Sequence, residues 1–207
     1  MPPTDRPIPR FVAEPPHELE PRGRWRELLE KQFLEGCARI EGFADLGDPG
    51  PVSWCPERTY GGTTYVPATA GTAGGYELFG FVSFRRPDGS GDPTDFHASA
   101  DYTDETADRN PSWRLDLSDE VIARWDGPGK AAGDLTLIWG APLVVGGAVV
   151  TAELGDETLD QCGLGESERF TLVALDAVTG FGRELYLDVK LWDRRGQLVA
   201  TESLYEA

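Results

Sequence analysis

The feature that most constrains the fold is the long second part of the chain, where segments with strand periodicity alternate with turns rich in Gly and Pro. Segments of strand length lie at 63–68, 76–86, 94–103, 112–117, 134–140, 142–154, 169–178, 183–193 and 197–205. Most are not separated by a helical stretch of ten or more residues. Parallel βαβ units are therefore disfavoured, and an antiparallel meander is favoured.

The segment 183–193 shows how such a strand divides its two faces. The odd-numbered residues from Leu185 to Leu191 are aliphatic, whereas the even-numbered residues are polar or aromatic. About eight or nine such strands exceed what an open, strongly twisted sheet carries comfortably. We therefore expect an α+β, mainly β fold in which the meander curls into a barrel or half-barrel.

One amphipathic helix is predicted at 24–40, upstream of the strands. Its apolar residues recur at steps of three and four along one stripe, which consists of Trp25, Leu28, Leu29, Phe33, Cys37 and Ile40. We expect this helix to pack against the sheet and to end near Gly42.

The first 22 residues contain seven prolines before position 22, at 2, 3, 7, 9, 15, 16 and 21, which is too many for a helix or a central strand. We expect an extended arm over 1–22 followed by a single mainly β domain over 23–207. The arm is either a disordered tail or a strap laid across this domain or a neighbouring subunit. Because Ile8, Phe11 and Val12 need a docking surface, the strap is favoured, with a second copy of the chain or another protein as its partner.

The charge balance bounds the partners. Asp and Glu number 36 against 19 Lys and Arg, which gives a formal net charge of −17 and repels phosphate backbones and anionic membrane surfaces. Neither nucleic acid nor a membrane is expected as a partner. Three cysteines without CxxC spacing predict free thiols, and with no recognisable signal peptide they indicate the cytoplasm.

The segment 94–103 carries the strongest candidate for chemistry. Read with a period of two, it places Phe96 and Tyr102 on one side and His97 on the other, together with Asp101 and the upstream Asp95. An imidazole flanked by carboxylates suits a general-base pair or part of a metal site, although an outer, solvated strand face has the same composition. We take Asp95, His97 and Asp101 as candidate catalytic residues and expect no metal or cofactor.

The stretch "WCPERTYGG" at 54–62 is a second candidate. Cys55 lies near Arg58, whose charge favours a nucleophilic thiolate, but a buried and unreactive cysteine is the preferred interpretation. Aromatic residues on strand faces and beside this loop are predicted to contact a ligand, namely Tyr60, Tyr65, Tyr186 and Trp192.

The predicted function is a small-molecule-binding or enzymatic barrel, with a small hydrophobic or mixed-polarity ligand held between the concave sheet and the helix. The alternative is a non-catalytic subunit or interaction module of a larger assembly. A weaker alternative rests on the segments 141–154 and 185–205, which would suit a sheet wrapped around a helix and so resemble hot-dog-like acyl-thioester enzymes. A deep pocket containing His97 would favour the first hypothesis, and a filled interior with an apolar outer patch the second.

Overall fold

The computed structural model describes residues 14–17, 21–86, 92–125, 133–155, 157–175 and 187–204 of the 207-residue chain. Within these residues the protein is mainly β, and every strand pairing is antiparallel, as the sequence predicts. The described part contains one α-helix, α1 (Gly23–Cys37), and a short 3-10 helix, η1 (Phe43–Leu46). No helix in this part is long and apolar enough to cross a membrane.

Three sheets make up the fold. The helix-bearing sheet has the order β1-β3-β4-β5-β6, with β2 also paired to β4. Its strands are β1 (Glu14–His17), β2 (Ser53–Trp54), β3 (Glu57–Tyr60), β4 (Thr63–Gly71), β5 (Glu77–Arg85) and β6 (Thr94–Thr103).

The remaining strands form two further sheets. The central sheet has the order β11-β8-β7, and its strands are β7 (Leu115–Trp125), β8 (Gly133–Pro142) and β11 (Phe170–Leu175). The outer sheet has the order β10-β9-β12-β13, and its strands are β9 (Val149–Leu154), β10 (Glu157–Gly163), β12 (Leu187–Trp192) and β13 (Leu198–Leu204).

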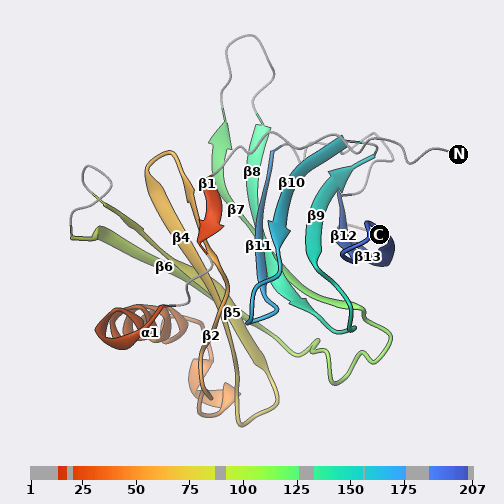
Figure 1. Ribbon diagram of the computed structural model, residues 1–207. Helices are drawn as coiled ribbons and strands as arrows, with labels where there is room; N and C mark the ends of the chain where they lie inside the picture. Colours follow the sequence, from red (N-terminus) through yellow and green to blue (C-terminus); the bar gives the residue numbers. More distant parts are fainter. Residues whose placement is uncertain are drawn as a thin grey trace, which may run out of the picture.

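The elements stack in layers, with α1 on the helix-bearing sheet, then the central sheet, then the outer sheet (Figure 1). Strand β8 shows how the central sheet serves two cores. Leu137 and Trp139 belong to the cluster shared with the helix-bearing sheet, whereas Ile138 belongs to the cluster shared with the outer sheet. Because both faces are covered, the segment is apolar nearly throughout instead of alternating strictly.

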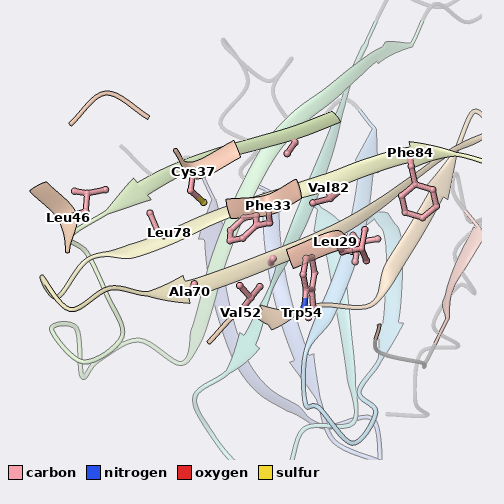
Figure 2. Packing of buried hydrophobic residues seen from close by; sticks show 13 residues of the cluster. Leu29, Phe33, Cys37, Leu46, Val52, Trp54, Ala70, Leu78, Val82 and Phe84 are labelled. Atoms are coloured by element: carbon pink, nitrogen blue, oxygen red, sulfur yellow. The ribbon is translucent and has the colours of Figure 1, made fainter. Parts of the chain in front are cut away.

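Helix α1 packs on the sheet through Leu29, Phe33 and Cys37, each with no exposed surface (Figure 2). The prediction that Leu28 belongs to the buried stripe is wrong, because this residue lies at the edge of the contact and is 38% exposed. The helix also ends three residues earlier than predicted. Arg39 and Ile40 donate to carbonyls three residues back, at Gly36 and Cys37, and this tighter bonding converts the last predicted turn into a non-α turn.

The predicted strands are largely present, and several that the pattern did not predict join them. Strand β6 has the predicted bounds, and β12 places Leu187, Val189 and Leu191 inward as expected, with no exposed surface. Strands β1, β2, β3 and β10 were not predicted, and β7 runs further than its apolar start suggests. None of the described sheets closes on itself.

Candidate functional site

The predicted polar stripe of β6 lies on the surface. Ala98 faces α1 and is 7% exposed, and Phe96 packs partly against the same core. Asp95, His97 and Asp101 are all exposed on the strand. The side of β6 that carries Phe96 and Ala98 is therefore the packed side, although Tyr102 at its end is 39% exposed, and the histidine is outside the core.

Near this stripe the structure adds a carboxylate that the sequence pattern did not reveal. Glu120 on β7 accepts a hydrogen bond from Ser99 Oγ, with 2.7 Å between Oγ and Oε1. Burial raises the pKa of Glu120, and Ser99 and His97 lower it, while Asp101 raises it further. The stripe therefore faces a half-buried carboxylate. Among the described residues, no group of three or more His, Cys, Asp or Glu side chains is arranged to hold a metal ion.

The aromatic residues predicted to bind a ligand are not gathered at one place. Tyr65 is 8% exposed and packs edge-on against Phe81, and Tyr60 lies nearby on β3. Trp192 belongs to the outer sheet, where its indole Nε1 donates to Thr151 Oγ1 at 2.9 Å. Tyr186 lies outside the described residues.

A polar cleft of about 180 Å³ opens where α1, β2 and the segment before β11 meet. Side chains from all three elements line it, and they are Arg26, Val52, Ser53, Trp54, Ser167 and Arg169. Two of these residues, Val52 and Trp54, also belong to the core cluster under α1, where they lie beside Leu29 and Phe33 (Figure 2). The cleft therefore lies between the helix and the strands.

Helix periodicity positions Arg26 at the cleft. Arg26 lies three residues before Leu29 and seven before Phe33, so its aliphatic stem shares the buried side of α1 and its head reaches the rim. Its Nη2 donates to the carbonyl oxygen of Val52 at 3.1 Å. This contact holds the guanidinium over β2.

Arg169 reaches the cleft from the residue before β11. Its Nη1 donates to Thr69 Oγ1 at 3.4 Å and lies 3.9 Å from Cys55 Sγ. Neither Arg169 nor Arg26 forms an ion pair with any residue that the structure describes. The two guanidinium groups therefore keep N–H donors that face no carboxylate within ion-pair distance.

Two carboxylates interact electrostatically with Arg169, one from the central sheet and one from the helix-bearing sheet. Asp116 on β7 pairs with Ala141 and Phe170 pairs with Gly140, so Arg169 falls in the same row of the sheet as Asp116. A side chain at position 140 would collide with the carbonyl oxygen of Asp116, so a glycine is needed there for the close approach of β7 and β8.

Glu77 at the start of β5 completes this group. Burial, assisted by Asp116, raises the pKa of Glu77 to about 7, and Arg169 acts in the opposite direction. The pKa of Asp116 is also raised by burial and lowered by Arg169. The structure thus places an arginine between an open polar cleft and two carboxylates whose ionisation is disfavoured.

The cysteine near this arginine is not a nucleophile in this structure. Cys55 is 1% exposed, and burial raises its pKa to about 11 even though Arg169 lowers it. Since the thiolate is the reactive form, Cys55 stays a protonated core residue at neutral pH. All three cysteines, Cys37, Cys55 and Cys162, are buried and free of disulfides.

A second arginine of the same stretch is wholly buried. Arg58 on β3 forms an ion pair with Asp160 on β10, and neither side chain has exposed surface. Asp160 also accepts hydrogen bonds from the backbone N–H groups of Gln161 and Val173, both at 2.8 Å. This pair connects the helix-bearing sheet to the outer sheet.

Comparison of the chain with protein-family models, with curated proteins and with solved structures gave no match.

Proposed function

We propose that this protein binds a small molecule in the polar cleft between α1 and the strands. The observation that carries the proposal is the convergence of Arg26 and Arg169, from distant parts of the chain, on one cleft. Neither arginine has an ion-pair partner among the described residues. In a chain with 36 acidic residues, intramolecular carboxylate partners are abundant, so two cations left open at one place favour a ligand from outside.

This cleft lies beside the helix, but its lining does not include His97 and is more polar than the pocket that the sequence predicts. Buried apolar side chains pack together under α1 and between the central and outer sheets. The proposed ligand is therefore small and seated at the polar mouth where the layers meet, not inside the core. The cytoplasm remains the proposed compartment, in keeping with three free thiols.

Barrel closure also stays a proposal. Strand β10 contacts β11, and β13 contacts β7, so the central and outer sheets approach each other at both edges. Arg114, at the start of β7, donates through Nη2 to the carbonyl oxygen of Val199 on β13 at 3.1 Å. These contacts support a flattened barrel made of the two sheets, with side chains filling its interior.

A fragment screen on the full-length protein tests the binding proposal. The readout is the NMR chemical shift of backbone amide groups and of the tryptophan indole N–H groups. We expect fragments that bind to move the signals of Ser53, Trp54 and Ser167 together. The variant Ser167→Trp fills the cleft and should abolish those shifts, whereas Ser112→Trp, on an exposed loop, should not. Fragments that bind equally well to the Ser167→Trp variant would overturn the proposal.

A second candidate is a proton-transfer site on β6, with His97, Asp95 and Asp101 as its catalytic residues. The specific observation in its favour is Glu120, a half-buried carboxylate that is hydrogen-bonded to Ser99 and interacts with His97. If a reaction is found, His97→Ala and Glu120→Gln should each reduce its rate by about 10²-fold or more. An unchanged rate in both variants would remove this candidate.

The interaction-module alternative has its own observation. Leu143, Val145 and Leu198 are large apolar residues that are 41%, 96% and 53% exposed. The arm is the other surface proposed for a partner, and β1 pairs with β3 at the edge of the helix-bearing sheet. Sedimentation of the full chain and of a variant lacking residues 1–16 tests this role, since an identical monomer in both would exclude an assembly through the arm. The acyl-thioester alternative has only the packing of a helix on a sheet in its support.

A further inference from the structure

We infer that the ligand of the cleft carries an oxyanion, a carboxylate or a phosphate group, held between the guanidinium groups of Arg26 and Arg169. This inference rests on the proposed binding function and names the chemical class of its ligand.

The first support is the balance of donors and acceptors in the cleft. Its lining side chains with polar groups are two guanidinium cations, the hydroxyls of Ser53 and Ser167, and the indole of Trp54, and none is a carboxylate. Guanidinium groups match carboxylate and phosphate oxygens in paired, charge-assisted hydrogen bonds. A ligand with negatively charged acceptor oxygens is therefore the complement of this lining.

The second support is the indole of Trp54. Trp54 is 2% exposed, and its Nε1–H is buried without a hydrogen-bond partner among the residues that the structure describes. A buried N–H without an acceptor is unfavourable, because its lost hydration is not replaced. Trp54 is also one of the residues that line the cleft, and an acceptor oxygen bound there would satisfy this donor if the indole turned its N–H toward the open space.

The size of the cleft sets a limit on the ligand. A volume of about 180 Å³ equals that of about six water molecules, at about 30 Å³ each. It holds an oxyanion group and a short chain, but not a nucleotide, so any larger ligand extends into solvent. The formal charge of −17 argues against a polyanion as the source of the group.

The carboxylates behind Arg169 shape this site. The charged groups that act there are Glu77 from β5 and Asp116 from β7, and Thr69 and Cys55 are the other side chains in contact with Arg169. Burial raises the pKa of both carboxylates, that of Glu77 to about 7, and no ion pair joins Arg169 to either of them in the described part of the chain. The positive charge of Arg169 is what an incoming oxyanion meets.

The experiment measures binding of two probes by calorimetry and by the Trp54 indole signal, at constant ionic strength set with sodium chloride. The probes are inorganic phosphate and succinate, and the protein is the full chain. We expect saturable binding of at least one probe, and we expect Arg26→Gln and Arg169→Gln to weaken it about tenfold to a hundredfold each. The matched control is Arg24→Gln, an exposed arginine of the same helix, which removes the same charge and should change affinity less than twofold.

The possible outcomes separate the two proposals. Stronger binding of phosphate or of succinate identifies the group, and both results support the inference provided that the arginine variants weaken binding. Binding that Arg24→Gln weakens as much as Arg169→Gln would show only general charge attraction and would overturn it. If neutral fragments bind the cleft and neither probe does, the oxyanion is wrong and the binding function stands. If no fragment and no probe binds, both proposals fail.

Arg169→Lys keeps the charge and should recover part of the affinity, which excludes simple unfolding as the cause of a loss.

Discussion

Arg58 and the two cleft arginines differ in burial and in the groups that the fold places beside them. Arg58 is fully buried, and its carboxylate partner Asp160 also accepts two backbone hydrogen bonds. Arg26 and Arg169 are half-buried, donate only to neutral acceptors among the described residues, and face an open cleft. The first guanidinium is paired with a carboxylate in the interior, whereas the other two face an open cleft and have no carboxylate within ion-pair distance among the described residues.

This difference separates a structural role from a binding role. A buried charge must be paired where it lies, since an isolated one is costly to desolvate, so Arg58 and Asp160 fix β3 and β10 relative to each other. The cleft arginines are partly hydrated and have no such requirement. Substitutions should therefore affect stability at the first place and ligand affinity at the second.

The largest expected effect is the loss of one partner of the buried pair. Asp160→Asn removes the carboxylate that pairs with the buried Arg58, so the free energy of unfolding should fall by about 3–5 kcal/mol. Urea denaturation measures it. The control is Asp104→Asn, which removes an exposed ion pair of 3.6 Å with Arg109 and should cost less than about 1 kcal/mol. Equal effects at the two positions would break the comparison, because burial would then not decide the cost.

The core beneath the cleft gives the next effect. Phe33 has no exposed surface and contacts the ring of Trp54 with centroids 6.2 Å apart. Phe33→Ala should lower the free energy of unfolding by about 3–5 kcal/mol through the cavity it leaves. Leu28→Ala, on the exposed shoulder of the same helix, should cost much less. A thermal melt that Phe33→Ala leaves unchanged would refute the packing of α1.

A smaller effect depends on pH at Glu77, behind Arg169. Its pKa is about 7 in the fold against an ordinary value of 4.5, so between these values the folded chain binds more protons than the unfolded chain. The free energy of unfolding therefore falls as pH rises from about 4.5 to about 7. Glu77→Gln should remove this fall and be the more stable protein at pH 8, by on the order of 1 kcal/mol because Glu77 is only partly buried.

The measurement is denaturant unfolding at pH 5 and pH 8. Glu105→Gln, at an exposed carboxylate, serves as the control and should keep the pH dependence of the parent. If Glu77→Gln keeps that dependence as well, the carboxylate behind Arg169 is not the titrating group. Asp116, whose pKa burial also raises, would then be the next candidate for the titrating group.

The sequence predicted the elements whose inward residues are apolar. The stripe of α1 and the alternation of β6 and β12 are examples, because burial of apolar side chains is what sets those periodicities. Strands β3 and β10 escaped prediction for a physical reason. Their inward positions hold Arg58 and Asp160, so the buried ion pair interrupts the apolar pattern in both strands.

The cleft was beyond prediction for a different reason. Arg26 reads as one of several charged positions on an amphipathic helix, and Arg169 as the polar start of a strand. Only the packing of α1 and β11 around β2 brings them to one place, and no local pattern encodes that packing. Trp54 is the first residue of the stretch 54–62, but only the three-dimensional structure shows that its N–H is buried without a partner among the described residues.

The smallest expected effect concerns the polar stripe of β6. Like the cleft it is polar, but its side chains Asp95, His97 and Asp101 are exposed on the surface of a strand. His97 is exposed, so His97→Ala should change the free energy of unfolding by less than about 0.5 kcal/mol and leave oxyanion affinity unchanged. Ser99→Ala should cost about 1 kcal/mol, because it removes the hydrogen bond that the half-buried Glu120 accepts. His97 does not line the cleft, so its removal should not affect a ligand bound there. A loss of oxyanion affinity in His97→Ala would therefore show that the stripe and the cleft act as one site. If both variants keep the free energy of unfolding of the parent, water replaces the hydrogen bond from Ser99 to Glu120. The stripe would then contain no buried group whose hydration depends on a neighbouring side chain.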